Sequence, residues 1–305
     1  RAEIEWDLVG LSDPTRPDLG ALALGRKLCA GYDALLVPVL AGLERVAVAG
    51  VGGYGRGALS LRSDLDLRIL VRKESDADGV TERVLYPLWD AGLSVGHQVV
   101  VLSQIVELAK EDLKTATSLL DWRHLAGDAT LSDEVVWRVS GSLFSRSELA
   151  RFAERLRGEV AGRHERYGDS VFLLEPDLKN GAGALRDFDV LRWAARARYG
   201  VGEVEALLRL GALSAREAQE LGLAEDLLWR IRFHLHKHAG RKSDRLTFDQ
   251  QEAVAAALGY GATGDAVERL MSDYYRAARV ISRQMTVFLG RLEQSERKKP
   301  KVREL

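Results

Sequence analysis

The chain has 305 residues, of which 46% are hydrophobic and 29% charged, a composition typical of a soluble globular protein long enough for two domains. Its 44 basic and 45 acidic side chains leave a formal net charge of −1, which argues against a general nucleic-acid-binding surface. The single cysteine, Cys29, excludes an internal disulfide, and no membrane-spanning stretch or signal peptide is apparent, so we expect a cytoplasmic protein.

The first part of the chain carries a pattern of strands and helices that predicts a small mixed sheet ending near residue 130. Residues 1–18 contain Pro14 and Pro17, and we expect them to be loosely structured. Because the chain opens on Arg rather than Met, we expect it to be a piece of a longer protein. The expected elements are a helix over 20–43, strands over Val46–Val51, Leu65–Val71 and Leu93–Leu102, and a helix over Val80–Ala91.

From about residue 145 onward the hydrophobic spacing is almost wholly helical. Ser214 followed by Glu217 is a capping-box signature that marks one helix start. The predicted helices are Glu148–Arg166, Leu185–Tyr199, Val204–Arg209, Ser214–Ala239, Asp249–Leu258 and Gly264–Leu292. The fold class is therefore α+β, with a helical lead-in (1–44), a small mixed-sheet domain (45–135), an all-helical domain (136–293) and a charged tail (294–305) that includes Arg297–Lys301.

The most informative segment runs from Gly50 to Val71, where a glycine-dense turn precedes two aspartates at the head of an apolar run. Alternate side chains on a strand point to opposite faces, so Asp64 and Asp66 share one face. The other face carries Leu65, Leu67, Ile69 and Val71. Two neighbouring carboxylates repel unless a cation lies between them, which is the arrangement of a Mg²⁺ site. The glycines let backbone N–H groups approach a phosphate closely.

Three further segments carry unusual combinations of charge. Glu175–Asp187 is a loop with two acids, a lysine and an arginine, and it leads into a predicted helix. Leu228–His236 and Arg241–Asp249 add arginines, histidines and aspartates. His234, His236 and His238 resemble a metal cluster, but only the first and last share a helix face, so we interpret them as structural, like the strand residue His97.

The glycine turn followed by S-D-x-D-L resembles the signature of the DNA polymerase beta-like nucleotidyltransferase superfamily. With the other three segments in the same order, residues 20–292 resemble the N-terminal half of the bacterial PII uridylyltransferase/uridylyl-removing enzyme family. The resemblance implies a nucleotidyltransferase domain followed by a family-specific helical domain. It also implies transfer of UMP from UTP to a tyrosine of the PII nitrogen-regulatory signalling protein, with Mg²⁺ or Mn²⁺ as the cofactor and neither membrane nor nucleic acid as a partner.

The resemblance also assigns roles to single residues. Asp64 and Asp66 are expected to bind the metal, and a third carboxylate is expected from Glu175 or Asp177, because the strand at Val95–Val101 offers none. The remaining expected contacts are Gly52 and Gly53 to the β- and γ-phosphates through N–H groups, Ser63 to a phosphate, Arg56 to a phosphate or to its own loop, and Lys179 and Arg186 to the triphosphate or to local partners.

The family pattern is not fully kept. Val100 stands where the family usually has arginine, Ala58 replaces the acid after G-R-G, and Ala182 and Ala184 replace Pro and Gly. These departures leave three alternatives open: transfer of AMP to another protein, transfer to a small molecule, and a non-catalytic nucleotide-sensing module. The loop at Glu175–Asp187 is expected to close the nucleotide site from the helical domain.

Overall fold

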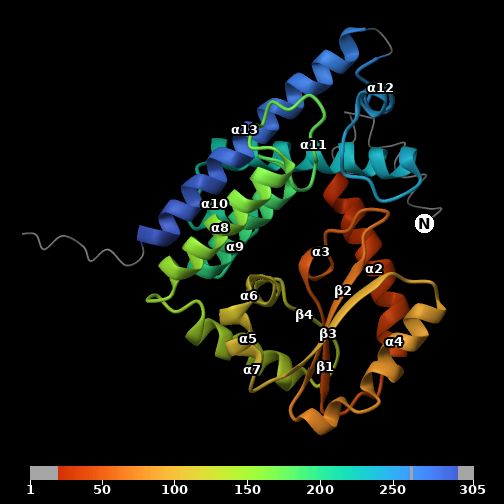
Figure 1. Cartoon of the computed structure of the whole chain (residues 1–305), viewed down its shortest axis with the longest axis vertical. Helices are drawn as coiled ribbons and strands as arrows, with labels where there is room; N and C mark the ends of the chain where they lie inside the picture. The colour runs from red at the N-terminus through yellow and green to blue at the C-terminus, as the bar shows by residue number, and fades with distance from the viewer. Residues whose placement is uncertain (1–19, 262–263, 295–305) are drawn as a thin grey trace, which may run out of the picture.

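The computed structural model describes residues 20–261 and 264–294, which form a sheet with flanking helices and, next to it, a group of longer helices (Figure 1). The expectations for residues 1–18 and for Arg297–Lys301 lie outside this described part. Within it, no helix combines the length and the apolar character needed to cross a membrane. The predicted α+β class is confirmed.

The sheet has four strands in the order β3-β2-β1-β4. Strand β1 pairs antiparallel with both β2 and β4, whereas β2 and β3 run parallel, so the sheet is mixed as expected. The strands are β1 (Val46–Gly50), β2 (Leu65–Val71), β3 (Val95–Val101) and β4 (Arg123–Gly127). The first three were predicted within two residues at each end, and β4 was not predicted.

Helices cover both faces of the sheet, with α2 and α4 on one side and α5, α6 and α7 on the other (Figure 1). Helix α7 packs on β1, β2 and β4, although it crosses the boundary that we predicted at residue 135. The elements of this region are α2 (Ala21–Val39), α3 (Gly52–Gly55), the 3₁₀ helix η2 (Glu74–Ala77), α4 (Val80–Asp90), α5 (Ile105–Glu111), α6 (Leu113–Leu120) and α7 (Ala129–Ser142).

The second group consists of six helices, all at positions that the periodicity predicts. The long helix α13 packs against α8, α9 and α11. At the start of α11, Glu217 and Ser214 accept hydrogen bonds from each other's backbone N–H at 2.9 and 3.2 Å, which confirms the capping box. The helices are α8 (Leu149–Tyr167), α9 (Leu185–Tyr199), α10 (Val204–Arg209), α11 (Ala215–Ala239), α12 (Phe248–Ala257) and α13 (Asp265–Glu293).

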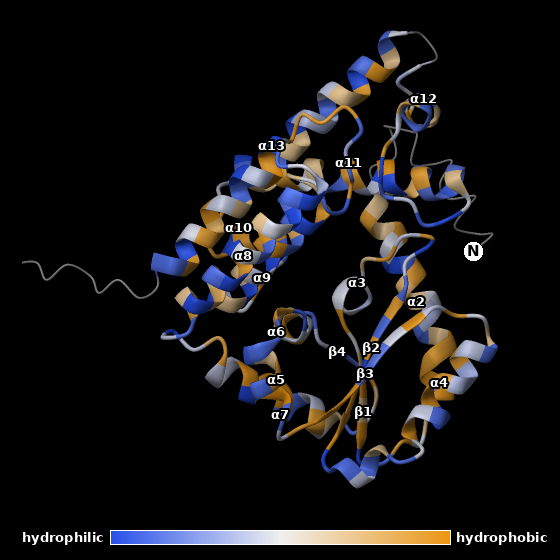
Figure 2. Cartoon of the chain, viewed as in Figure 1, coloured by the Kyte–Doolittle hydropathy of each residue, from blue (hydrophilic) through white to orange (hydrophobic). Residues whose placement is uncertain are grey.

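Strand β1 is buried along its whole length and hydrophobic throughout, whereas the helices alternate between hydrophobic and hydrophilic surfaces (Figure 2). In β2, Leu65, Leu67 and Ile69 are at most 2% exposed, while Asp66 between them is exposed. The apolar residues therefore fix the strand in the core and leave the aspartates on the opposite face, as the alternation predicts.

Candidate active site

A cavity of about 590 Å³ opens between the sheet and the second group of helices. Both parts of the chain contribute charged side chains to its wall, and in the described residues the cations outnumber the acids. From the sheet region the lining includes Gly52, Gly53, Arg56, Ser63, Asp64, Asp66, Arg68 and Lys114, and from the helical region it includes Arg163, Lys179, Arg186, Asp189, Trp229, Arg232 and Lys242.

Asp64 and Asp66 lie together at this cavity, one just before β2 and the other inside it. Ser94 donates its hydroxyl to Asp64 Oδ1 at 2.8 Å, and Lys242 donates its ammonium to Asp64 Oδ2 at 2.5 Å. Burial opposes ionisation of Asp64, but these two hydrogen bonds outweigh it and hold the pKa of the carboxyl below its ordinary value. Asp64 is thus an anion already paired with a cation.

The carboxylate of Asp66 lies in a space that two glycines leave open. A Cβ atom at Gly96, the β3 partner of Asp66, would come within 2.7 Å of Asp66 Oδ1. At Gly52, where φ is +57°, a Cβ would come within 3.3 Å of Oδ2. Although Asp66 is open to the cavity, the surrounding protein partly desolvates its carboxylate, and this effect first and then the negative charge of Asp64 raise its pKa. A cation placed between the two carboxylates would relieve that repulsion.

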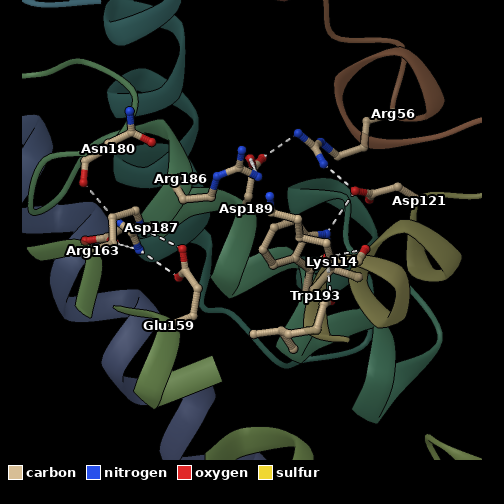
Figure 3. A network of polar contacts seen from close by, with 12 residues as sticks. Arg56, Lys114, Asp121, Glu159, Arg163, Asn180, Arg186, Asp187, Asp189 and Trp193 are labelled. Atoms are coloured by element: carbon tan, nitrogen blue, oxygen red, sulfur yellow. Dashed lines mark hydrogen bonds and ion pairs between the residues drawn. The ribbon is translucent and has the colours of Figure 1, made fainter. Parts of the chain in front are cut away.

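Arg56 is buried and holds the glycine turn rather than projecting freely into the cavity. Its guanidinium pairs with Asp121, which follows α6, and at 2.9 Å with Asp189 of α9 (Figure 3). Asp121 also accepts hydrogen bonds from Trp193 Nε1 at 2.9 Å and from Arg196 Nη1 at 2.9 Å. These ion pairs fix the loop and tie the sheet region to α9, and Arg56 also lines the cavity.

Glu175 and Asp177 do not line the cavity, contrary to the expectation of a third metal-binding carboxylate. Glu175 accepts a hydrogen bond from the N–H of Phe248, at the start of α12, and pairs with Arg245. Asp177 accepts the N–H groups of the next turn, those of Lys179 and Asn180. Both acids are occupied by backbone and side-chain donors of their own region. Among the described residues no group of three or more acids, histidines or cysteines has a metal-binding arrangement.

The same loop nevertheless carries Lys179 and Arg186 to the cavity, as predicted. Asp187 is fully buried and anchors the loop by accepting the N–H of Gly183 at 2.7 Å and Arg163 Nη2 at 2.7 Å (Figure 3). Arg163 in turn donates to the carbonyl of Asn180 at 2.9 Å. Because the loop is tied down on both sides of Gly183, its basic side chains are held toward the aspartate pair.

Lys179 differs from its neighbours in having no anionic partner within hydrogen-bonding distance among the described residues. Burial lowers its pKa first, and the positive charges of Arg232 and Arg186 lower it further. Neighbouring cations that lower the pKa of a lysine create a positive potential, which stabilises an anion that binds there. Arg186, by contrast, pairs with Asp189 at 3.3 Å and lies over the Trp193 ring, so part of its charge is already compensated.

Ser63 is turned toward its own loop, where its hydroxyl accepts the N–H of Ser60 at 3.0 Å, although it also lines the cavity. Two of the histidines make contacts within the protein. His97 stacks edge-on against Trp89 of α4, with ring centroids 5.7 Å apart. His236 is fully buried between Ser60 and Asp244.

Several cavity residues had no role in the sequence interpretation, above all Asp121, Asp189, Trp193, Arg232 and Lys242. Arg232 and Lys242 fall inside segments whose charge was noticed, but nothing in the spacing indicates which charges face the cavity. The pairing of Asp121 with Trp193 spans 72 residues, and no local pattern signals it.

Comparison with known proteins connects this site to one family. Residues 151–289 match a family model described as GlnD PII-uridylyltransferase. The chain is 39% identical over 261 residues to a protein of Rhodospirillum rubrum named bifunctional uridylyltransferase/uridylyl-removing enzyme, a match that covers 84% of this chain and 28% of the relative. Proteins of the same name from Phenylobacterium zucineum (38% over 254 residues, 82% and 27%) and Cereibacter sphaeroides (39% over 267 residues, 85% and 28%) are similar as well. The chain thus spans little more than a quarter of these relatives' length.

Proposed function

We propose that this chain, which belongs to the PII-uridylyltransferase family, is a nucleotidyltransferase acting on PII. The family model matches residues 151–289, and the Rhodospirillum rubrum relative is 39% identical in a match that covers 84% of the chain. It transfers UMP from UTP to a tyrosine hydroxyl of the PII signalling protein and releases pyrophosphate. One observation carries the proposal: Asp64 and Asp66 face the same cavity as the Lys179 ammonium, which has no anionic partner in the described part of the chain. A cation site would then lie next to an anion site.

The residues present fit a divalent cation such as Mg²⁺ or Mn²⁺. Asp64 and Asp66 offer carboxylate oxygens, the ligands that these ions prefer. The ammonium of Lys242 on Asp64 shows that positive charge is accommodated there, and the space beside Gly52 and Gly96 leaves the Asp66 oxygens accessible. When bound, the cation neutralises negative charge on the attacking and leaving oxygens of the phosphoryl transfer.

The triphosphate would extend from the aspartate pair toward the helical region. Lys179 supplies an uncompensated charge there, and Arg232 and Arg186 lie close enough to depress its pKa. Gly52 and Gly53 belong to the first turn of α3, whose N–H groups have no acceptor within the helix, so they are available to phosphate oxygens. Binding groups on both walls would hold the α-phosphate in line with the incoming hydroxyl.

The protein's own contribution is therefore positioning and charge compensation. The tyrosine oxygen forms the new bond to the α-phosphorus and gives up its proton to water, while the bond from that phosphorus to the pyrophosphate oxygen breaks and pyrophosphate leaves. The buried carboxylate of Asp121 binds both Arg56 of the glycine turn and Trp193 of α9. These contacts keep the sheet wall and the helical wall of the cavity at a fixed separation. A displacement of either wall would misalign the reacting atoms, which is costly for an in-line transfer.

A nucleotide panel tests the proposal. The chain is incubated with Mg²⁺, PII and each of UTP, CTP, GTP and ATP labelled at the α-phosphate, and label on PII is measured. We expect transfer from UTP above all, and loss of transfer when the acceptor tyrosine is replaced by Phe. Preferred transfer from ATP would instead support adenylylation. Tight nucleotide binding without transfer from any of the four would indicate a nucleotide-sensing module.

A further inference from the structure

The ion pair between Lys242 and Asp64 joins the segment after α11 to the start of β2. The Lys242 ammonium lies 2.5 Å from Asp64 Oδ2, and the side chains remain 46% and 41% exposed. The proposed function gives this same carboxylate to a divalent cation. A divalent cation at Oδ2 would lie close to the Lys242 ammonium, and repulsion between the two positive charges would favour departure of the lysine.

The physical chemistry of the pair allows this exchange. An ion pair this exposed is weak, because water screens both charges. Lysine is a compact charge on a flexible four-carbon stem, so its ammonium can move several ångströms without backbone change. Asp64 keeps its orientation meanwhile, since Ser94 holds the other oxygen at 2.8 Å.

The surroundings indicate where the ammonium would go. Asp244, two residues after Lys242 in the chain, is already bound by Arg232 at 2.7 Å and by His236 at 3.1 Å. Asp66 also interacts with the Lys242 charge, but it is the second ligand of the proposed cation site, whereas Lys179 is a cation whose pKa is lowered in part by Lys242 itself. Lys242 would therefore add to an excess of positive charge that only an incoming polyanion compensates.

We propose that Lys242 is an exchangeable counter-ion: it neutralises Asp64 in the nucleotide-free protein and transfers to the triphosphate when Asp64 binds the divalent cation. The inference rests on the proposed function and adds to it an order of events. Cation and nucleotide then bind with positive coupling. The cation releases Lys242 from Asp64 for the triphosphate, and the triphosphate holds Lys242 away from Asp64 and leaves that carboxylate free for the cation. The free protein binds divalent cations weakly, and metal–nucleotide binds as a unit.

The test is calorimetric and does not depend on turnover. Lys242→Met removes the charge and keeps most of the length of the side chain. Arg241→Met is the control: it makes the same charge change at the neighbouring residue, which is exposed and has no partner among the described residues. Titration with Mn²⁺ alone should show roughly fivefold tighter binding to Lys242→Met, the upper end for loss of an exposed ion pair, and no change in Arg241→Met. Titration with UTP in the presence of Mg²⁺ should show roughly tenfold weaker binding to Lys242→Met, since a charge-assisted contact to phosphate is lost.

Opposite effects on the two ligands distinguish exchange from simple damage to the loop, which would weaken both. Equal Mn²⁺ affinity in Lys242→Met and the wild type overturns the inference and leaves the proposed function standing. Tighter Mn²⁺ binding with unchanged UTP binding overturns the transfer to the triphosphate. If Mn²⁺ binds neither protein, or still binds after Asp64→Asn is added to Lys242→Met, the cation site itself is wrong and the proposed function fails with it.

Discussion

Trp193 donates its indole N–H to the buried carboxylate of Asp121 at 2.9 Å, and this hydrogen bond joins α9 to the end of α6 across the cavity floor. The same carboxylate compensates Arg56 and Arg196. One side chain thus holds the glycine turn, the sheet region and the helical region in a common arrangement. The cavity depends on this buried network as much as on the residues that face the substrate.

Asp121→Asn should destabilise the protein strongly. It leaves Arg56 without its closest compensating charge in the interior, and breaking a buried ion pair by removing one partner costs about 3–5 kcal/mol. Urea unfolding measures the change in free energy. The same substitution at exposed Asp133 on α7 serves as the control and should leave the unfolding midpoint unchanged. Equal stability of the two variants would show that the network does not hold the two regions together.

Gly183→Ala should be far more damaging than Gly200→Ala, although both glycines have positive φ, +72° and +75°. At Gly200 a Cβ meets open space, so only backbone strain of about 1–2 kcal/mol is expected. At Gly183 a Cβ would lie 2.3 Å from the carbonyl oxygen of Ala278 in α13, and the loop that carries Lys179 must shift. Thermal unfolding and UTP titration should both show the difference, and similar losses in the two variants would contradict the close packing seen here.

The pH dependence of stability should report on His234. Burial lowers the pKa of His234 to about 4, and its Nε2 atom has no hydrogen-bond partner among residues 20–261 and 264–294. The unfolded chain, with a histidine pKa near ~6.5, then binds the proton more tightly than the folded one, so stability is complete above that pH and falls as the pH drops toward 4. His234→Phe should remove this part of the pH dependence, on the order of 3 kcal/mol.

Unfolding midpoints measured between pH 7 and pH 4 for the wild type and His234→Phe make the comparison. His238→Phe, on the same helix but exposed, is the control and should keep the wild-type pH profile. Parallel profiles for the wild type and His234→Phe would mean that His234 takes up its proton in the folded state without cost.

Lys179→Met should weaken UTP binding in the presence of Mg²⁺ by roughly tenfold or more, because a charge-assisted contact to phosphate is lost from a partly buried position. The lowered pKa of Lys179 adds a second expectation. As the pH rises, Lys179 loses its proton at a lower pH than an ordinary lysine does, so the affinity of the wild type for UTP should also begin to decline at a lower pH. Lys110→Met, which removes an exposed lysine paired with Glu107, is the control. Equal affinity of the Lys179 variant and the control would place the triphosphate elsewhere.

Much of the fold follows from local sequence signals. The buried strand β1 and the helices α8–α13 have strong hydrophobic periodicity, and their bounds were predicted within a few residues. In the region from 103 to 142 the sequence analysis predicted no helix or strand. Strand β4, Arg-His-Leu-Ala-Gly, has mixed polarity, and its main support is pairing with β1, about 75 residues earlier in the chain, which no local pattern reveals.

The site divides in the same way. Alternation along β2 was sufficient to place Asp64 and Asp66 on one face, because strand geometry is local. A third carboxylate was expected from Glu175 or Asp177, because the family resemblance implies one and the strand at Val95–Val101 has no acid. Neither argument shows that Glu175 accepts the N–H of Phe248 at the start of α12 or that Asp177 holds its own turn. Lys242 reaches Asp64 across 178 residues, a contact that only the tertiary fold creates.

The central claim is that Asp64 and Asp66 together hold the cation required for nucleotidyl transfer. The most direct test is the transfer of labelled UMP to PII by Asp64→Asn and Asp66→Asn at saturating Mg²⁺, with unfolding midpoints measured on the same preparations. We predict that transfer is lost by at least about a hundredfold in each variant, since a cation ligand is removed, while stability of Asp66→Asn holds or rises as like-charge repulsion is relieved. Wild-type turnover in either folded variant would contradict the claim.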